Sequence, residues 1–203
     1  MEGEVRVGEM VGAAGTFNQL RGDKTGSMIV QAGSGDLYES TNSGDVFGVC
    51  NQAPVAITSH MDTTYTGLVV GNTTGTGKDL VILGFGMAMD TAVPTAATCF
   101  GLMTGAGDSP GDDLTPRNRF LGGPKSVAWA SDGCTLPGTP VLEQPLAYGW
   151  AEADTVGTLG PLMYYNVAGS MIITPGYFVA AQSVTGNSAC PIFSFLWKEV
   201  DRV

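Results

Sequence analysis

Apolar residues in this chain recur in short runs separated by polar, glycine-containing segments. Between residues 45 and 89 four runs are rich in β-branched, aliphatic and aromatic residues, and the separators NQA, SHMDT and NTTGTGK consist largely of turn-forming residues. Short runs bounded in this way indicate β-strands. We therefore predict strands at 45–49 (DVFGV), 54–58 (PVAIT), 64–71 (TYTGLVVG) and 79–89 (DLVILGFGMAM).

The pattern inside two of these runs predicts how their faces are used. Residues 80–85 are apolar on both faces, which favours a central strand between two layers. Residues 64–71 instead show the period-two alternation of a half-buried strand. This places Thr66, Leu68 and Val70 on one face and Tyr65, Gly67 and Val69 on the other.

The remainder of the chain continues in the same style. The segments TAATCFGLMTG, KSVAWAS and TPVLEQPLAYGWAEA predict further strands. Pro140 and Pro145 confine the third of them to a sheet edge or a bulge, because proline cannot donate a ladder hydrogen bond. A strand, turn, strand unit follows, in which Pro175-Gly176 joins 171–173 to 177–181. The terminal run CPIFSFLWKEV alternates Phe193, Phe195 and Trp197 with Ile192, Ser194 and Leu196.

These patterns predict an all-β fold. We count nine to eleven short strands, no amphipathic helix and no repeat of fixed period, which favours an antiparallel β-sandwich or jelly roll, with a barrel as the main competitor. The strongly patterned part begins at Asp45, so we expect one domain at 45–203. Residues 1–44 are glycine-rich and weakly patterned, and they predict an extended arm that lies along its own domain or a neighbouring subunit.

Charge and composition exclude several partners. The chain has 203 residues and a net charge of −10, and Arg117 and Arg119 are its only close basic pair, so a nucleic-acid partner is not expected. The longest apolar stretch, 80–89, is about half of what a membrane span needs. The start, MEGEVRVGEM, lacks the apolar region of a secretory signal, so we expect synthesis in a cytosol.

The cysteines fit the same compartment. They are far apart and form no CxxC motif, which predicts free thiols and no zinc site; they are Cys50, Cys99, Cys134 and Cys190.

Two short motifs resemble catalytic signatures and fail on chemistry. In 72–79 (NTTGTGKD) the Gly-Lys pair of a phosphate-binding loop is present, but its first glycine and its Mg²⁺-binding hydroxyl are replaced, which leaves the interpretation of a hairpin loop. In 107–111 (GDSPG) the serine of a nucleophile elbow is followed by Pro110, which lacks the required N–H. His60 is the single histidine. We therefore expect neither an enzyme nor a cofactor.

Carboxylates provide two weaker alternatives. Asp108, Asp112 and Asp113 lie in one glycine-rich loop and are suited to Ca²⁺, although their spacing is not that of an EF-hand, so no metal site is expected. A hydrolase would need two carboxylates at a fixed separation, which sequence cannot establish. The available residues are Asp62, Glu143, Glu152, Asp154 and Glu199.

Aromatic residues offer a sugar-stacking platform as an alternative to a core or subunit contact. The residues concerned are Trp129, Trp150, Trp197, Tyr148, Tyr164, Tyr165 and Tyr177.

Several strand and turn elements resemble a known class of proteins. The segments GSMIITPGYFVAA and FSFLWKEV, with TLPGTPVLEQPL and TGLVVGNTTGTGKDLVILGFG upstream, are similar to virion structural proteins of tailed bacteriophages, in particular cement or decoration proteins. The resemblance covers most of 45–203. It implies a β-sandwich or jelly-roll domain, commonly in a trimer, with arms that cross neighbouring subunits.

The resemblance implies a structural role on the outside of a phage capsid. We expect a homo-oligomer, a trimer, that binds the major capsid protein and stabilises the shell. A glycan-binding head of a virion fibre is the alternative. Contact between subunits is expected at Phe17, Leu20, Met28, Ile29, Tyr177, Phe193, Phe195 and Trp197.

Overall fold

The computed structural model describes residues 21–22, 28–29, 37–53, 63–89, 98–109, 111, 114–149, 163–184 and 191–202. The chain divides into two compact units, Met1–Glu39 and Ser40–Val203. The first contains two short strands, β1 (Arg21–Gly22) and β2 (Met28–Ile29), which pair antiparallel. A five-residue helix, α1 (Tyr38–Asn42), spans the junction. The arm predicted for 1–44, with its boundary at residue 45, stays a prediction.

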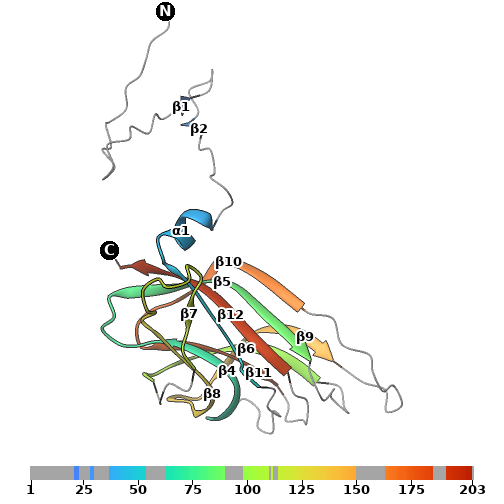
Figure 1. Ribbon diagram of the computed structural model, residues 1–203. Helices are drawn as coiled ribbons and strands as arrows, with labels where there is room; N and C mark the ends of the chain where they lie inside the picture. The colour runs from blue at the N-terminus through green and yellow to red at the C-terminus, as the bar shows by residue number, and fades with distance from the viewer. Residues whose placement is uncertain are drawn as a thin grey trace, which may run out of the picture. The chain divides into compact units, whose positions relative to one another are not determined.

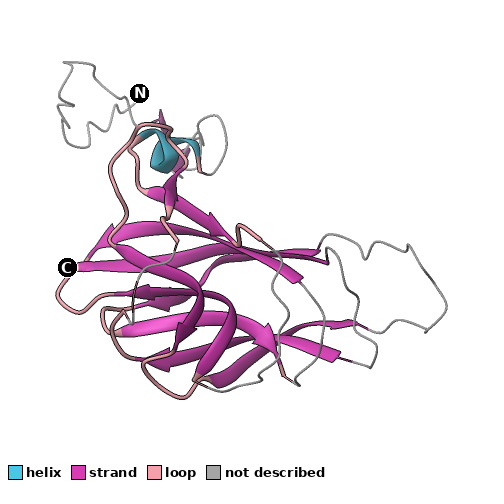
Figure 2. Cartoon of the chain, turned by 60° about the horizontal axis from the view of Figure 1, so that its bottom comes forward, coloured by secondary structure: helices cyan, strands magenta, loops and turns pink. Residues whose placement is uncertain are grey.

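The second unit is built from two five-stranded antiparallel sheets that stack as layers (Figures 1 and 2). One sheet, called here the β12 sheet, contains β3 (Val46–Cys50), β5 (Lys78–Met89), β7 (Arg117–Asn118), β10 (Met163–Ile173) and β12 (Pro191–Asp201). The other, the β11 sheet, contains β4 (Thr64–Asn72), β6 (Thr98–Ala106), β8 (Ala128–Thr135), β9 (Val141–Gly149) and β11 (Tyr177–Ser183). The sandwich prediction is confirmed.

The strand order is that of a jelly roll. The β12 sheet runs β10-β5-β12-β3-β7, and the β11 sheet runs β8-β4-β11-β6-β9. From β3 onward, every connection except β8 to β9 crosses from one sheet to the other, as in the double-sheet jelly roll. The two-residue strand β7 lies at one edge of the β12 sheet, beside β3. Strand β8 lies at one edge of the β11 sheet, beside β4. Both sheets have open edges among the described residues, so the barrel alternative is wrong.

Inward-facing side chains of both sheets form one apolar core. Phe85 lies at the centre of an aromatic group, with Phe195 and Phe193 at centroid distances of 5.3 and 5.9 Å, and Trp197 stacks on Phe47. The β11 sheet contributes residues such as Phe100. Burial of these large side chains is the main apolar contribution to the stability of the sandwich.

The alternation predicted for β12 is present, but its aromatic side was expected at a subunit contact and lies in the core. Phe193, Phe195 and Trp197 point inward and are fully buried, whereas Ile192 and Leu196 are only half-buried on the outer face. The edge position predicted from Pro140 and Pro145 is confirmed as well, because β9 is an edge strand with register shifts near Pro145. The strand predicted at 54–58 lies outside the described residues.

Two turns differ from their predictions in the same way. Pro175-Gly176 does form a turn, with Gly176 at φ 84, but β10 and β11 belong to different sheets and form no hairpin. The 72–79 turn likewise joins β4 to β5 across the sandwich. Asn72 fixes this turn by donating to the carbonyls of Lys78 and Ile173, so its polar side chain is structural.

The predicted half-buried character of β4 is wrong for residues 67–71, where both faces of the strand are covered. Leu68 and Val70 face the core, while Val69 packs in a second cluster on the outer side of the β11 sheet with Trp129 and Phe178. Glycine permits this second layer: the Trp129 indole lies directly over Gly71. For β5 the prediction was a central strand covered on both faces. Its central position in the sheet is confirmed, but Val81 and Leu83 are only half-buried on the outer face.

Within the described part of the chain, no helix has the length and apolar character needed to cross a membrane.

Candidate functional site

A groove of about 360 Å³ lies beside the edge of the β12 sheet formed by β3 and β7. One wall consists of Gly48, Cys50 and Gln52, which belong to β3 or follow it. The groove exists because β7 is shorter than β3. Its two residues pair with Phe47 and Gly48, so among the described residues the last part of β3 has a strand neighbour only on the β12 side.

The opposite wall is the segment that leads into β7. Leu114 donates its N–H to the carbonyl of Ala130 in β8 at 3.1 Å and is therefore held by the other sheet. Three residues later Arg117 pairs with Gly48 in the β12 sheet. The segment crosses the side of the sandwich and diverges from β3 as it does so, which leaves a wedge-shaped space between the two walls.

Two arginines line the β7 end of the groove. Arg117 and Arg119 are exposed, and neither forms an ion pair with a carboxylate of the described residues. The guanidinium of Arg119 lies over Gly48, where a Cβ atom would overlap it. The absence of a side chain at Gly48 thus lets this cation approach the backbone of β3 closely beside the groove.

The thiol of Cys50 is half-buried in the same groove. Burial raises its pKa, and the positive charge of Arg119 partly offsets this effect. A thiol with a raised pKa is a poor nucleophile at neutral pH. Cys50 thus contributes a half-buried thiol to the wall of the groove.

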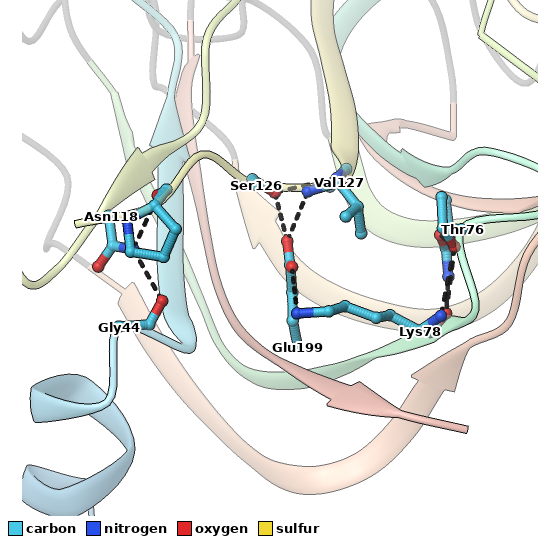
Figure 3. Close-up of polar contacts among 10 residues, drawn as sticks. Gly44, Thr76, Lys78, Asn118, Ser126, Val127 and Glu199 are labelled. Atoms are coloured by element: carbon cyan, nitrogen blue, oxygen red, sulfur yellow. Dashed lines mark hydrogen bonds and ion pairs between the residues drawn. The ribbon is translucent and has the colours of Figure 1, made fainter. Parts of the chain in front are cut away.

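The loop after β7 carries two exposed apolar side chains next to this groove. Leu121 is 89% exposed and Phe120 48% exposed. Their loop is held firmly. The side-chain amide of Asn118 donates to the carbonyls of Gly44 at 2.7 Å and Pro124 at 3.0 Å (Figure 3). Its oxygen accepts a hydrogen bond from the N–H of Phe120. We call Phe120 and Leu121 the apolar tip.

A firmly held apolar tip beside two unpaired arginines has the composition of a protein-docking surface. Exposed large apolar residues are costly to display without a partner, and aromatic residues and arginine are enriched at protein interfaces. The two arginines and the two residues of the apolar tip all lie within five consecutive residues, 117–121. The arrangement is a candidate docking surface, and residues 117–121 contain no nucleophile paired with a base.

The predicted subunit contacts are distributed differently. Phe193, Phe195 and Trp197 have their side chains in the core of their own domain, so their assignment to a subunit interface is wrong. The alternation of β12 turns its aromatic face inward. Tyr177 is 53% exposed and remains a prediction. Met28 and Ile29 lie in β2, where the structure describes backbone pairing only, and Phe17 and Leu20 lie outside the described residues.

The other candidate residues separate into structural and undescribed ones. Glu199 is buried and held by Lys78, Ser126 and Val127, so it is a structural carboxylate. Asp108 accepts a 2.7 Å hydrogen bond from the N–H of Thr74. His60 lies outside the described residues, as do Asp62, Asp112, Asp113, Glu152 and Asp154. Among residues that the structure does describe, no cluster suited to a metal ion occurs.

A sugar-stacking platform, the alternative to a core or subunit contact, does not form from the described aromatic residues. Trp129 and Trp197 are buried. Tyr165 packs against the core and donates its hydroxyl to the carbonyl of Leu146. Tyr164 and Tyr177 are exposed but lie on different sheets. The side chains of Tyr148 and Trp150 are outside the described part.

Sequence reasoning missed the groove and the apolar tip. It did single out Arg117 and Arg119 as the only close basic pair, which was the available signal. The flanking Phe120-Leu121-Gly122-Gly123 has the form of an apolar pair at a glycine turn, but exposure of such a pair is visible only once the fold is known.

No protein-family model, curated protein or solved structure matches this chain.

Proposed function

We propose that this protein is a virion structural protein of the capsid cement or decoration type, which binds the outside of a phage shell as an oligomer. The observation that carries the proposal is the apolar tip, Phe120 and Leu121, held rigidly beside Arg117 and Arg119. Such a surface serves docking to another protein. The major capsid protein is the partner we propose, and a trimer is the oligomer.

The fold supports the proposal by analogy. Double-sheet jelly rolls occur in viral capsid proteins and in lectins, although a fold does not by itself determine function. Between these two roles the surface favours the first. Its exposed apolar residues lie with arginines in one short segment, whereas exposed Tyr164 and Tyr177 lie on different sheets. A glycan-binding head remains the second candidate, and reproducible binding on glycan arrays would favour it.

The proposal can be tested with empty capsids of the virus that encodes the chain. Purified protein should have the mass of a trimer by light scattering and should co-sediment with the shells. Leu121→Ser should weaken shell binding by about tenfold, since a truncated anchor residue at an interface costs on the order of 1–2 kcal/mol. Val141→Ser is the matched control, because Val141 is also exposed but lies on β9 in the other sheet.

Two results would overturn the proposal. One is a monomer that does not co-sediment with shells at any concentration tested. The other is unchanged binding of the Leu121→Ser variant, which would remove the tip from the interface.

A further inference from the structure

We propose that the groove binds an extended acidic segment of another protein chain, which adds a strand to the open edge of β3 and places a carboxylate against Arg117 and Arg119. This inference rests on the proposed docking function and names the chemistry of the partner segment. It is carried by the hydrogen-bonding direction of β3, the shape of the groove and the position of the two cations.

The backbone of β3 presents hydrogen-bonding groups toward the groove. Asn51 donates its N–H to Phe193 of β12, and Arg119 donates its N–H to Val46 from the opposite side. Because the N–H and C=O groups of successive residues point alternately to the two sides of a strand, those of residues 46, 48 and 50 point toward the β7 side. β7 stops opposite Gly48, so Cys50 is the residue whose backbone groups face the groove.

An added strand would therefore bond at Cys50. Its carbonyl at present accepts a 2.9 Å hydrogen bond from the exposed side-chain amide of Gln52. An incoming backbone N–H can replace this contact without leaving a buried group unpaired, since Gln52 can turn to water. Addition of an extended peptide to an exposed sheet edge is a recurrent mode of peptide recognition.

The opposite wall leaves space for such a strand. The segment from Leu114 to Arg117 passes from β8 to β3, so it cannot follow β3 to its end. Pro116 within it has no N–H and could not continue the ladder as a donor. Among the described residues, the edge of β3 is thus open at Cys50 and covered by β7 at Phe47 and Gly48. An added strand would therefore end where β7 begins.

The two arginines favour a carboxylate on the incoming segment. A guanidinium presents a planar set of donors that matches a carboxylate, and the guanidinium of Arg119 already lies over Gly48 at the groove. The chain as a whole has a net charge of −10, which opposes a polyanion such as nucleic acid. One or two carboxylates, flanked by side chains that contact the apolar tip, suit this local site.

Cys50 gives a built-in probe of groove occupancy. The full-length protein is treated with iodoacetamide, and alkylation of each cysteine is followed by peptide mass spectrometry. The probe ligand is the blocked peptide acetyl-Val-Glu-Val-Glu-Val-amide. At a peptide concentration about ten times its Kd, alkylation of Cys50 should slow about tenfold. The rate at Cys134 in β8, which does not line the groove, should stay unchanged.

Matched peptides and variants identify what the protection depends on. Replacement of both glutamates by glutamine should abolish protection, and so should N-methylation of the central backbone amide. In the protein, Arg117→Gln with Arg119→Gln should abolish it, whereas Lys125→Gln, an exposed cation outside the groove, should not. Each variant is scored by the ratio of rates with and without peptide, because Arg119 also affects the thiol itself.

Each remaining outcome counts against the inference. Equal protection by the glutamine peptide would show that charge is not required, and equal protection by the N-methylated peptide would exclude strand addition. Protection by free glutamate alone would reduce the groove to a site for small anions. Protection that rises with protein concentration in the absence of peptide would assign the groove to a second copy. Shell binding is measured separately, so it can persist when the inference fails.

Discussion

The hydroxyl of Ser126 donates a 2.6 Å hydrogen bond to Oε1 of Glu199, a residue 73 positions later in the chain. The same oxygen accepts from the N–H of Val127, and the other carboxylate oxygen pairs with Lys78 at 3.6 Å (Figure 3). Glu199 lies in β12 and Ser126 leads into β8, so this carboxylate connects the two sheets. It is only 3% exposed.

Removal of this carboxylate should destabilise the sandwich. Glu199→Ala leaves two half-buried donors and one partly exposed cation without their acceptor, and we expect a loss of about 2 kcal/mol in the free energy of unfolding. Glu199→Gln keeps an acceptor for Ser126 and Val127 and should lose about half as much. Urea unfolding measures both, with Asp201→Asn, exposed at the end of the same strand, as the control. An unchanged midpoint for Glu199→Ala would contradict a structural role.

The contact of Trp129 with Gly71 makes a second prediction. A Cβ atom at Gly71 would overlap the indole, which is rigid and only 2% exposed. Gly71→Ala should therefore cost about 1–3 kcal/mol, the usual range for overpacking a buried site. Gly133→Ala in β8 is the matched control, since nothing lies within 4 Å of its Cβ position. Similar melting temperatures for the two variants would show that Trp129 moves aside freely.

The sequence predicted the strands well because the short apolar runs coincide with them. The two-residue alternation of β12 is present as predicted, although it did not show which side faces inward, and the prolines indicated the edge position of β9. It could not tell which strands are neighbours. A turn such as Pro175-Gly176 has the same local chemistry whether it joins paired strands or two sheets, so the sheet crossing depends on tertiary packing.

The site was harder to predict for a related reason. Aromatic residues near the end of the chain were expected at an interface, but Phe193 and Trp197 fill the core. Phe120 and Leu121, which are exposed, belong to a short glycine-containing loop for which the sequence analysis made no prediction. Whether an apolar residue is covered depends on distant segments, and one strand's pattern does not contain that information.

The charge of Arg119 should affect the reactivity of Cys50 in a defined direction. The guanidinium stabilises the thiolate and lowers the thiol pKa, against the larger effect of burial. Arg119→Gln should raise this pKa, so the pH profile of Cys50 alkylation should move to higher pH, while Arg119→Lys should leave it nearly in place. A profile that moves to lower pH in Arg119→Gln, with Cys134 as the internal reference, would refute the assigned effect.

Asn118 should control the order of the apolar tip. Its amide nitrogen donates to Gly44 and Pro124, and its oxygen accepts from Phe120. Asn118→Asp keeps an oxygen that accepts from the N–H of Phe120. It replaces the two hydrogen bonds donated to the carbonyls of Gly44 and Pro124 by unfavourable contact of a carboxylate with these carbonyls. We expect a loss of about 1–2 kcal/mol in the free energy of unfolding, and a similar loss for Asn118→Ala.

The effect should be largest in the loop itself. Hydrogen exchange should speed up at the amides of Phe120 and Gly123, because the second of these is held only by the turn that Asn118 supports. Shell binding should weaken even though Phe120 and Leu121 are unchanged, since a disordered tip must be ordered on docking. Normal exchange in the loop of Asn118→Asp, together with normal binding, would show that the tip is held by the backbone turn alone.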